Sequence, residues 1–404
     1  MSLHPNAPSP RVGGPGRGWV PAWGVGMAIL AAFTIYSAGS LTHGFVAYFA
    51  AARLLVDGSL GPNAYDDAWF GAYVQQLTAS SVREIFTPNP PTMALMAAPI
   101  AALDHALART IWLGVSLTAF GAAVFALAKA RHPHGAVPIP QLLLAMLAPA
   151  VFSNLRVGQG YLIVFALFAA AVVWLAERRD VRGGAALGAV LGLKLSGIAL
   201  LIILAAQQRW RAIAAAALVA IALALAVTPF IDAAMWRQHP DVVRAFVQRP
   251  SGSVTAYQTT LSLFRRLCVA DREWNPSPAA SCEAIAFAIP YALIAAAIVL
   301  TAIVAYRSNE PRLAAAAGTV LSLLALPAAA EVHFVLLGIP LLLIAMRPWP
   351  LAIIAALLIV PLEVTAERFT SGWAALLAYP RLYAAWLLWA ACIKDLLRKV
   401  SGGA

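Results

Sequence analysis

The sequence predicts an all-α protein that crosses a membrane many times, and three observations support this class. Of its 404 residues, 62% are hydrophobic and only 11% are charged, whereas a soluble domain of this length has far less interior to fill. The apolar residues are grouped into runs, and the longer runs approach the length of about 20 residues that a bilayer requires. Arginine and lysine lie at the ends of these runs, as they do beside membrane spans.

The apolar runs number about twelve and extend over most of the chain. They lie at approximately 19–41, 89–103, 106–128, 138–153, 157–176, 183–206, 211–231, 284–306, 313–328, 332–346, 350–363 and 379–394. Several are shorter than a full span, which is tolerated where protein or a water-filled cavity surrounds their ends. We therefore expect a disordered cytoplasmic tail over residues 1–18 and a single transmembrane domain over residues 19–397.

Two stretches outside the runs are predicted to be extracytoplasmic loops, at about 43–88 and 232–283. The first loop should contain an amphipathic helix near 45–56 and a second helix near 66–79. The second loop carries Cys268 and Cys282, fourteen positions apart. Disulfides persist outside the cytoplasm, so we predict a bond between these cysteines, with two free thiols as the alternative.

The formal net charge of +11 indicates membrane topology and contact with anionic lipids, not nucleic-acid binding, because the basic residues flank the runs. These basic residues and both termini can all be cytoplasmic only if the runs 89–103 and 183–206 each enter and leave the membrane on the same side. Both runs are then broken or re-entrant helices. Lys194 supports a break at Lys194–Gly197, because a lysine at the bilayer centre is costly and is functional by default.

Under this topology, polar side chains from six separate segments gather at the outer face of the bundle. Each of these residues alone is weak evidence of a functional site. Their position together on one side of the membrane is what indicates a site. They are His43, Asn89, Asn154, Arg156, Gln159, Lys194, Gln258, Thr260, Glu331 and His333.

Sequence motifs for soluble cofactors and metals are missing. There is no G-x-x-x-x-G-K-S/T, no G-x-G-x-x-G after a strand, no H-E-x-x-H and no paired C-x-x-C. We therefore expect no cofactor and no metal. An enzyme working outside then needs an energised substrate that is itself in the membrane, such as a polyprenyl-phosphate sugar. Lys194, Arg156 and His333 could supply charged donors to its phosphate.

Seven stretches carry a family resemblance that extends over most of the chain. They are "HGFVAYFAAARLLVDG", "AYDDAWF", "FTPNPPTMALMAAPIAAL", "VGQGYLIVFALF", "GGAALGAVLGLKLSGIALLIIL", "YQTTLSLFRRL" and "EVHF". In this order they resemble the polyprenol-phosphate-dependent glycosyltransferases of the GT-C class, specifically glycosyltransferase family 87.

The resemblance implies a GT-C-like helical bundle in the bacterial cytoplasmic membrane, with its active site facing outside. It implies transfer of a mannose-like hexose or a pentose from a polyprenyl-phosphate donor to a lipid or glycan acceptor, with inversion of the anomeric centre. Tyr48 and Arg53, on the helix after Gly44, are expected within reach of headgroups or substrate.

One position departs from the family pattern. The family usually has an aspartate, taken as the general base, directly before the phenylalanine that opens the first loop. Here that position is Gly44, preceded by His43. A histidine is suited to deprotonating a hydroxyl near neutral pH, so His43 is the predicted base, and contact with phosphate or headgroup is the alternative. Gly44→Asp should then partly rescue His43→Ala.

Asp66 and Asp67 are further candidates for the base, although their Tyr-Asp-Asp context is more typical of a helix cap. Two other functions remain open. Broken helices and a buried lysine also suit a transporter or flippase for a lipid-linked glycan. The missing aspartate also suits a family member that has lost catalysis and acts in glycan assembly.

Overall fold

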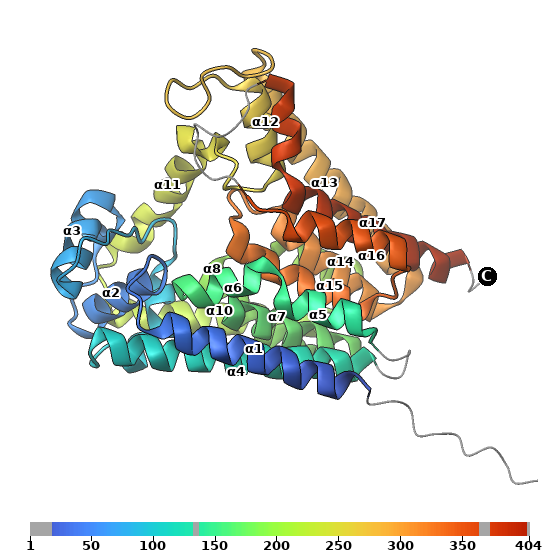
Figure 1. Ribbon diagram of the computed structural model, residues 1–404, viewed down its shortest axis with the longest axis horizontal. Coiled ribbons are helices and arrows are strands. Elements are labelled where there is room, and N and C mark those ends of the chain that lie inside the picture. The colour runs from blue at the N-terminus through green and yellow to red at the C-terminus, as the bar shows by residue number, and fades with distance from the viewer. Residues whose placement is uncertain (1–17, 132–136, 363–371, 402–404) are drawn as a thin grey trace, which may run out of the picture.

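The computed structural model describes residues 18–131, 137–362 and 372–401, and these residues form a helical bundle (Figure 1). In these ranges there is no strand, and the extended contacts are two isolated bridges, Leu60–Ile231 and Asp271–Asn275. The predicted all-α class is therefore confirmed. The predicted tail over residues 1–18 lies outside the described residues, apart from Gly18.

The first part of the chain supplies most of the helical bundle. Its helices are α1 (Trp19–Ala38), α2 (Phe45–Val56), α3 (Asp67–Thr78), α4 (His105–Arg131), α5 (Ile139–Leu147), α6 (Pro149–Val157), α7 (Tyr161–Ala176), α8 (Asp180–Lys194), α9 (Ile198–Ala206) and α10 (Trp210–Val227). Short 3₁₀ turns among them are η1 (Pro62–Tyr65), η2 (Pro91–Met96) and η3 (Ala98–Ile100). Here α1 and α4 run side by side along one edge (Figure 1).

The second part of the chain adds the large loop and the remaining helices. Its elements are η5 (Thr228–Phe230), α11 (Ala234–Gln248), η6 (Pro250–Ser253), α12 (Thr260–Cys268), α13 (Glu283–Ser308), α14 (Pro311–Leu324), η7 (Glu331–Leu337), α15 (Gly338–Leu343), α16 (Pro348–Ile359), η9 (Gly372–Ala378) and α17 (Pro380–Ser401). In Figure 1, α11 lies between α3 and α12, away from the main bundle.

Several helices are suited to cross a membrane. Among the described residues, five are long and apolar enough, or six if the bent pair η9 and α17 is one span. On α10 the side chains of Leu218, Ile221 and Leu225 are more than half exposed, as expected for a helix that faces lipid. The other apolar helices are shorter, so the predicted total of about twelve membrane segments is not confirmed.

Basic side chains that the sequence predicts on one side of the membrane meet at one end of the bundle. Arg178 donates to Asn309 Oδ1 at 2.8 Å, beyond the end of α13. At the end of α4, Arg131 donates to the Ile344 carbonyl at 3.0 Å and lies close enough to Arg312 for their charges to repel. We call this region the basic end.

The run 183–206 breaks where the sequence predicts it. Helix α8 ends at Lys194 and α9 begins at Ile198, and between them Leu195 has φ 50° and Gly197 has φ 100°. Positive φ angles cannot continue a right-handed helix. Just after α9, Arg209 pairs with Asp180 at the start of α8. The two helices therefore form a hairpin that starts and finishes at the basic end.

Helix α8 packs very closely against α10 because two glycines face it. A Cβ added at Gly184 would lie 2.1 Å from the Ala212 carbonyl oxygen, and one at Gly188 would lie 2.3 Å from that of Ala216. Small residues allow helix backbones in a membrane to approach in this way. The glycines that carry the family resemblance thus set the position of the helix that ends at Lys194.

Gly188→Ala should lower the free energy of unfolding by roughly 1–3 kcal/mol, the usual effect of overpacking a well-packed contact. The new methyl group meets backbone atoms of α10, which cannot turn aside as a flexible side chain could. Thermal unfolding of the purified protein in detergent measures the change. The matched control is Gly114→Ala on α4, where nothing lies within 4 Å of the added Cβ. Equal stability of the two variants would contradict the packing argument.

Both predicted loops have ordered structure. Cys268 and Cys282 form a disulfide with a Cα–Cα distance of 4.7 Å, as predicted, and it joins the end of α12 to the start of α13. In the first loop, α2 and α3 match the two predicted helices. The amphipathic character expected of 45–56 is wrong, because ten of the twelve residues of α2 are buried. Its polar residue Tyr48 is buried and contacts Lys194 inside the protein.

Candidate active site

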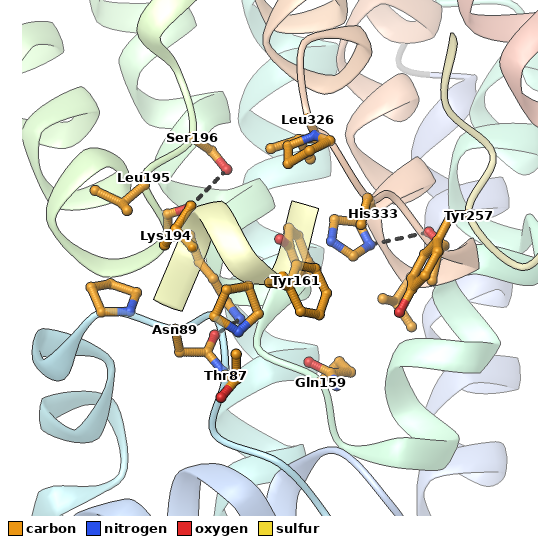
Figure 2. Close-up of a pocket in the computed structure, with 18 of the residues that line it drawn as sticks. Thr87, Asn89, Gln159, Tyr161, Lys194, Leu195, Ser196, Tyr257, Leu326 and His333 are labelled. Carbon is orange, nitrogen blue, oxygen red and sulfur yellow. Dashed lines mark hydrogen bonds between the residues drawn. The ribbon is translucent and has the colours of Figure 1, made fainter. Parts of the chain in front are cut away.

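A cavity of about 520 Å³ opens at the end of the bundle opposite the basic end. It lies between α2, the segment before η2, the α8–α9 break, α11 and the segment that leads into η7. Figure 2 shows that Asn89, Gln159, Tyr161, Lys194, Tyr257 and His333 line this space although they are far apart in the sequence. Helix α11 forms one wall with Val243 and Phe246.

Lys194 is the cationic centre of the cavity. Its Nζ donates to Asn89 Oδ1 at 2.8 Å and to the Tyr48 hydroxyl at 3.0 Å. It also lies 4.9 Å from the ring centroid of Tyr48 and 5.1 Å from that of Tyr161, within the range of a cation–π contact. All these partners are neutral groups, so they orient the ammonium group without cancelling its charge.

His333 lies on the other side of the cavity, at the start of η7. Its Nδ1 is 3.1 Å from the Ala330 carbonyl oxygen, and its ring centroid is 4.1 Å from that of Tyr161. A carbonyl oxygen only accepts hydrogen bonds, so Nδ1 carries the hydrogen. Behind it, Asn154 donates to the Val332 carbonyl at 2.8 Å. Asn154 therefore positions the histidine segment from the bundle side.

A carboxylate enters the cavity beside Gly44. The Gly44 amide donates to Glu84 Oε2 at 2.7 Å, and the Ile85 amide donates to Glu84 Oε1 at 3.0 Å. His43 Nδ1 is 3.7 Å from the same Oε2, but the His43 side chain is 70% exposed. Glu84 lines the cavity and His43 does not.

Gly44 holds a conformation that other residues avoid. Its φ is 98°, and an added Cβ would lie 2.5 Å from the Val157 carbonyl oxygen. This supports the prediction that Gly44 allows a sharp turn before α2. The geometry disfavours the expected rescue by Gly44→Asp, because an aspartate there would meet both the strained φ and the Val157 carbonyl.

Five of the residues predicted from the sequence line the cavity together. Gln159 accepts a hydrogen bond from the Tyr48 hydroxyl, which completes a chain of contacts from Gln159 through Tyr48 to Lys194. The five are Tyr48, Asn89, Gln159, Lys194 and His333.

The other predicted residues lie outside the cavity lining, and most have a structural partner. Asp66 caps α3 through the amides of Ala68 and Trp69, as its sequence context suggested. Asp67 pairs with Arg249 at 2.8 Å. Neither carboxylate is placed to act as a base in this cavity.

Two predicted cations also lie away from the cavity. Arg53 donates to the Leu103 carbonyl at 3.4 Å and lies over the Phe49 ring. Arg156 has an exposed side chain, and its carbonyl accepts from Thr42 and Arg109. The phosphate contact predicted for Arg156 therefore has no support in the geometry of this cavity.

Three predicted residues of the second half hold the protein together behind the cavity. Glu331 pairs with the buried Arg381 at 3.0 Å. Gln258 donates to the Ala378 carbonyl at 2.8 Å and accepts from the Arg381 amide at 3.1 Å. Thr260 is buried and accepts from Trp386 at 3.3 Å. These contacts join the large loop to α17.

Sequence reasoning missed Glu84, Tyr161 and Tyr257. The first two had a signal: Glu84 lies in the stretch that leads directly into Asn89-Pro90-Pro91, and Tyr161 follows the Gly-Gln segment. In the described part of the chain, no group of three or more His, Cys, Asp or Glu side chains is arranged to hold a metal ion.

Comparison with known proteins bears on the whole arrangement. The model of glycosyltransferase family 87 matches residues 86–327, more than half of the chain. Of the six polar residues that line the cavity in Figure 2, five lie in the matched region: Asn89, Gln159, Tyr161, Lys194 and Tyr257. No curated protein and no solved structure matches the chain. The chain therefore belongs to glycosyltransferase family 87 and is a membrane glycosyltransferase.

Proposed function

We propose that the cavity transfers a sugar, a mannose-like hexose or a pentose, from a polyprenyl-phosphate donor to a lipid or glycan acceptor. One observation carries the proposal: Lys194 presents an ammonium group in the cavity, and neutral groups alone hold it. In the described residues Lys194 forms no ion pair with an aspartate or glutamate. A structural ion pair is the other explanation for a lysine in an apolar segment. A cation held in this way is suited to an anionic ligand such as a phosphate.

The apolar wall of the cavity supports a lipid-linked donor. Leu195 and Ile198 line the cavity at the α8–α9 break, and their side chains are 47% and 57% exposed at the surface. The wall of the cavity therefore adjoins exposed apolar surface at the start of α9. In this proposal the polyprenyl chain leaves the cavity past these two side chains while the phosphate stays at Lys194.

The proposed reaction is a single displacement. The acceptor oxygen attacks the anomeric carbon, the bond to the phosphate oxygen breaks, and polyprenyl phosphate leaves with the bonding electrons. Lys194 stabilises the negative charge that develops on the leaving phosphate. The His333 ring adds to this only when it is protonated, because the neutral ring has its hydrogen on Nδ1 and a lone pair on Nε2. One displacement inverts the anomeric centre. The cavity lies opposite the basic end, which favours an active site on the extracytoplasmic side.

The test is transfer of labelled sugar from a polyprenyl-phosphate donor to an acceptor by the purified protein in detergent. Detergent micelles have no two compartments, so a flippase or an assembly partner would form no product there. Labelled product that depends on the protein is the expected result. Binding of the donor with no product, across a range of lipid and glycan acceptors, would contradict the proposal.

A further inference from the structure

We infer that Glu84 is the proton acceptor for the incoming hydroxyl, in place of the side chain that Gly44 lacks. This inference rests on the proposed function and adds a catalytic residue to it. It also moves the base role away from His43, Asp66 and Asp67. The observation behind it is the hydrogen bond from the Gly44 amide to Glu84 Oε2, at 2.7 Å.

The position of Glu84 follows from the backbone at Gly44. No side chain can be added at Gly44 without meeting the Val157 carbonyl, so this position cannot carry a carboxylate of its own. Glu84 comes from a different segment, forty residues further along, and its carboxylate binds the backbone amide of Gly44. It therefore supplies a carboxylate beside the position where the family usually has one.

The surroundings of Glu84 suit a base. In the described part of the chain it is the one aspartate or glutamate among the residues that line the cavity, and its side chain is 18% exposed. Two backbone amides fix its two oxygens, from Gly44 and Ile85. An ionised carboxylate has about four lone-pair sites, so two remain free to accept from a hydroxyl.

His43 is less suited to the same role. Its side chain is 70% exposed and lies outside the cavity lining. It therefore faces bulk water, whereas an acceptor hydroxyl would be held inside the cavity. Its Nδ1 faces Glu84 Oε2 at 3.7 Å. His43 is therefore assigned as a positioning residue that acts through Glu84.

The proton transfer balances with the displacement. The acceptor O–H bond breaks and its proton moves to a Glu84 oxygen, while the acceptor oxygen forms its bond to the anomeric carbon. The bond from that carbon to the phosphate oxygen breaks, and polyprenyl phosphate leaves with the electron pair beside Lys194. Glu84 then returns its proton to solvent, and no oxidant, reductant or further reactant is needed.

Glu84→Gln tests the assignment, because glutamine keeps an oxygen for the Gly44 amide and loses the ability to take a proton. We expect kcat for sugar transfer to fall by about 10²–10⁴-fold, the usual scale of general base catalysis, with donor Kd unchanged. Glu84→Asp retains a carboxylate and should keep more activity than Glu84→Gln. The matched control is Glu177→Gln, a half-exposed carboxylate paired with Arg179 at the surface, which should transfer at the wild-type rate.

Three results would overturn the assignment. If Glu84→Gln keeps more than about a tenth of the wild-type kcat, Glu84 is a structural residue, because the loss is then smaller than the roughly 10²-fold minimum expected for a base. If His43→Ala alone shows the large loss, the base is His43. If donor affinity falls together with kcat, Glu84 acts in binding. A wild-type protein that binds the donor and forms no product contradicts the proposed function instead, so the two failures are distinguishable.

Discussion

Glu331→Ala is expected to lower the free energy of unfolding by about 3–5 kcal/mol, the scale for removing one partner of a buried ion pair. The reason is Arg381, which is 1% exposed and has Glu331 as its ion-pair partner. Arg381 also donates to the Leu357 carbonyl at 2.6 Å, and a carbonyl cannot neutralise its charge. Without Glu331 the guanidinium charge stays buried and uncompensated, so α16, α17 and the start of η7 lose their common anchor.

Thermal or denaturant unfolding of the purified protein measures this effect. The matched control is Asp241→Ala, which removes a carboxylate from an ion pair with Arg244 whose two side chains are more than 70% exposed. Exposed pairs contribute little, so this variant should unfold like the wild type. If Glu331→Ala unfolds like the wild type and loses donor binding instead, Glu331 is a substrate ligand, as the sequence alone suggested.

Lys194→Ala is expected to weaken binding of the polyprenyl-phosphate donor by roughly 1.5–3 kcal/mol, the contribution of a hydrogen bond to a charged group. That loss corresponds to about a 10- to 150-fold rise in donor Kd. The partners of Lys194 are the Asn89 amide oxygen and the Tyr48 hydroxyl. Alanine leaves both in place, so the change removes the cation without leaving a buried charge unpaired.

Donor Kd from equilibrium binding, and a thermal unfolding curve to confirm intact folding, give the measurement for Lys194→Ala. Lys129→Ala makes the same change on an exposed lysine near the end of α4, at the basic end, and should bind donor as the wild type does. Wild-type donor affinity in a folded Lys194→Ala protein would remove the main support for phosphate binding at this site.

The local pattern of the sequence was sufficient for features that depend on near neighbours. Helix breaks follow from residue type and burial along one run, so the interruption at Lys194–Gly197 was predictable from a lysine and a glycine in an apolar segment. The disulfide followed from two cysteines in one polar loop. The gathering of basic side chains at one end followed from their places beside apolar runs, because charge distribution orients spans.

One expectation failed because contacts between distant segments override local pattern. The pattern of 45–56 looked amphipathic, yet ten of its twelve residues are buried and Tyr48 contacts Lys194 inside the protein. Asp66 follows its local pattern and caps α3, whereas only the tertiary structure pairs Asp67 with Arg249, just after α11.

By itself the sequence determined the helical membrane class, the family, the break that presents Lys194 and the cysteine pair, since each is set by composition or by residues close along the chain. The tertiary structure alone decided which polar groups meet in one cavity. It separated Lys194 and His333 from Glu331 and Gln258, and it brought Glu84 to the amide of Gly44. The physical reason is that a hydrogen bond between segments forty residues apart depends on how helices pack, and helix packing is a property of the whole bundle.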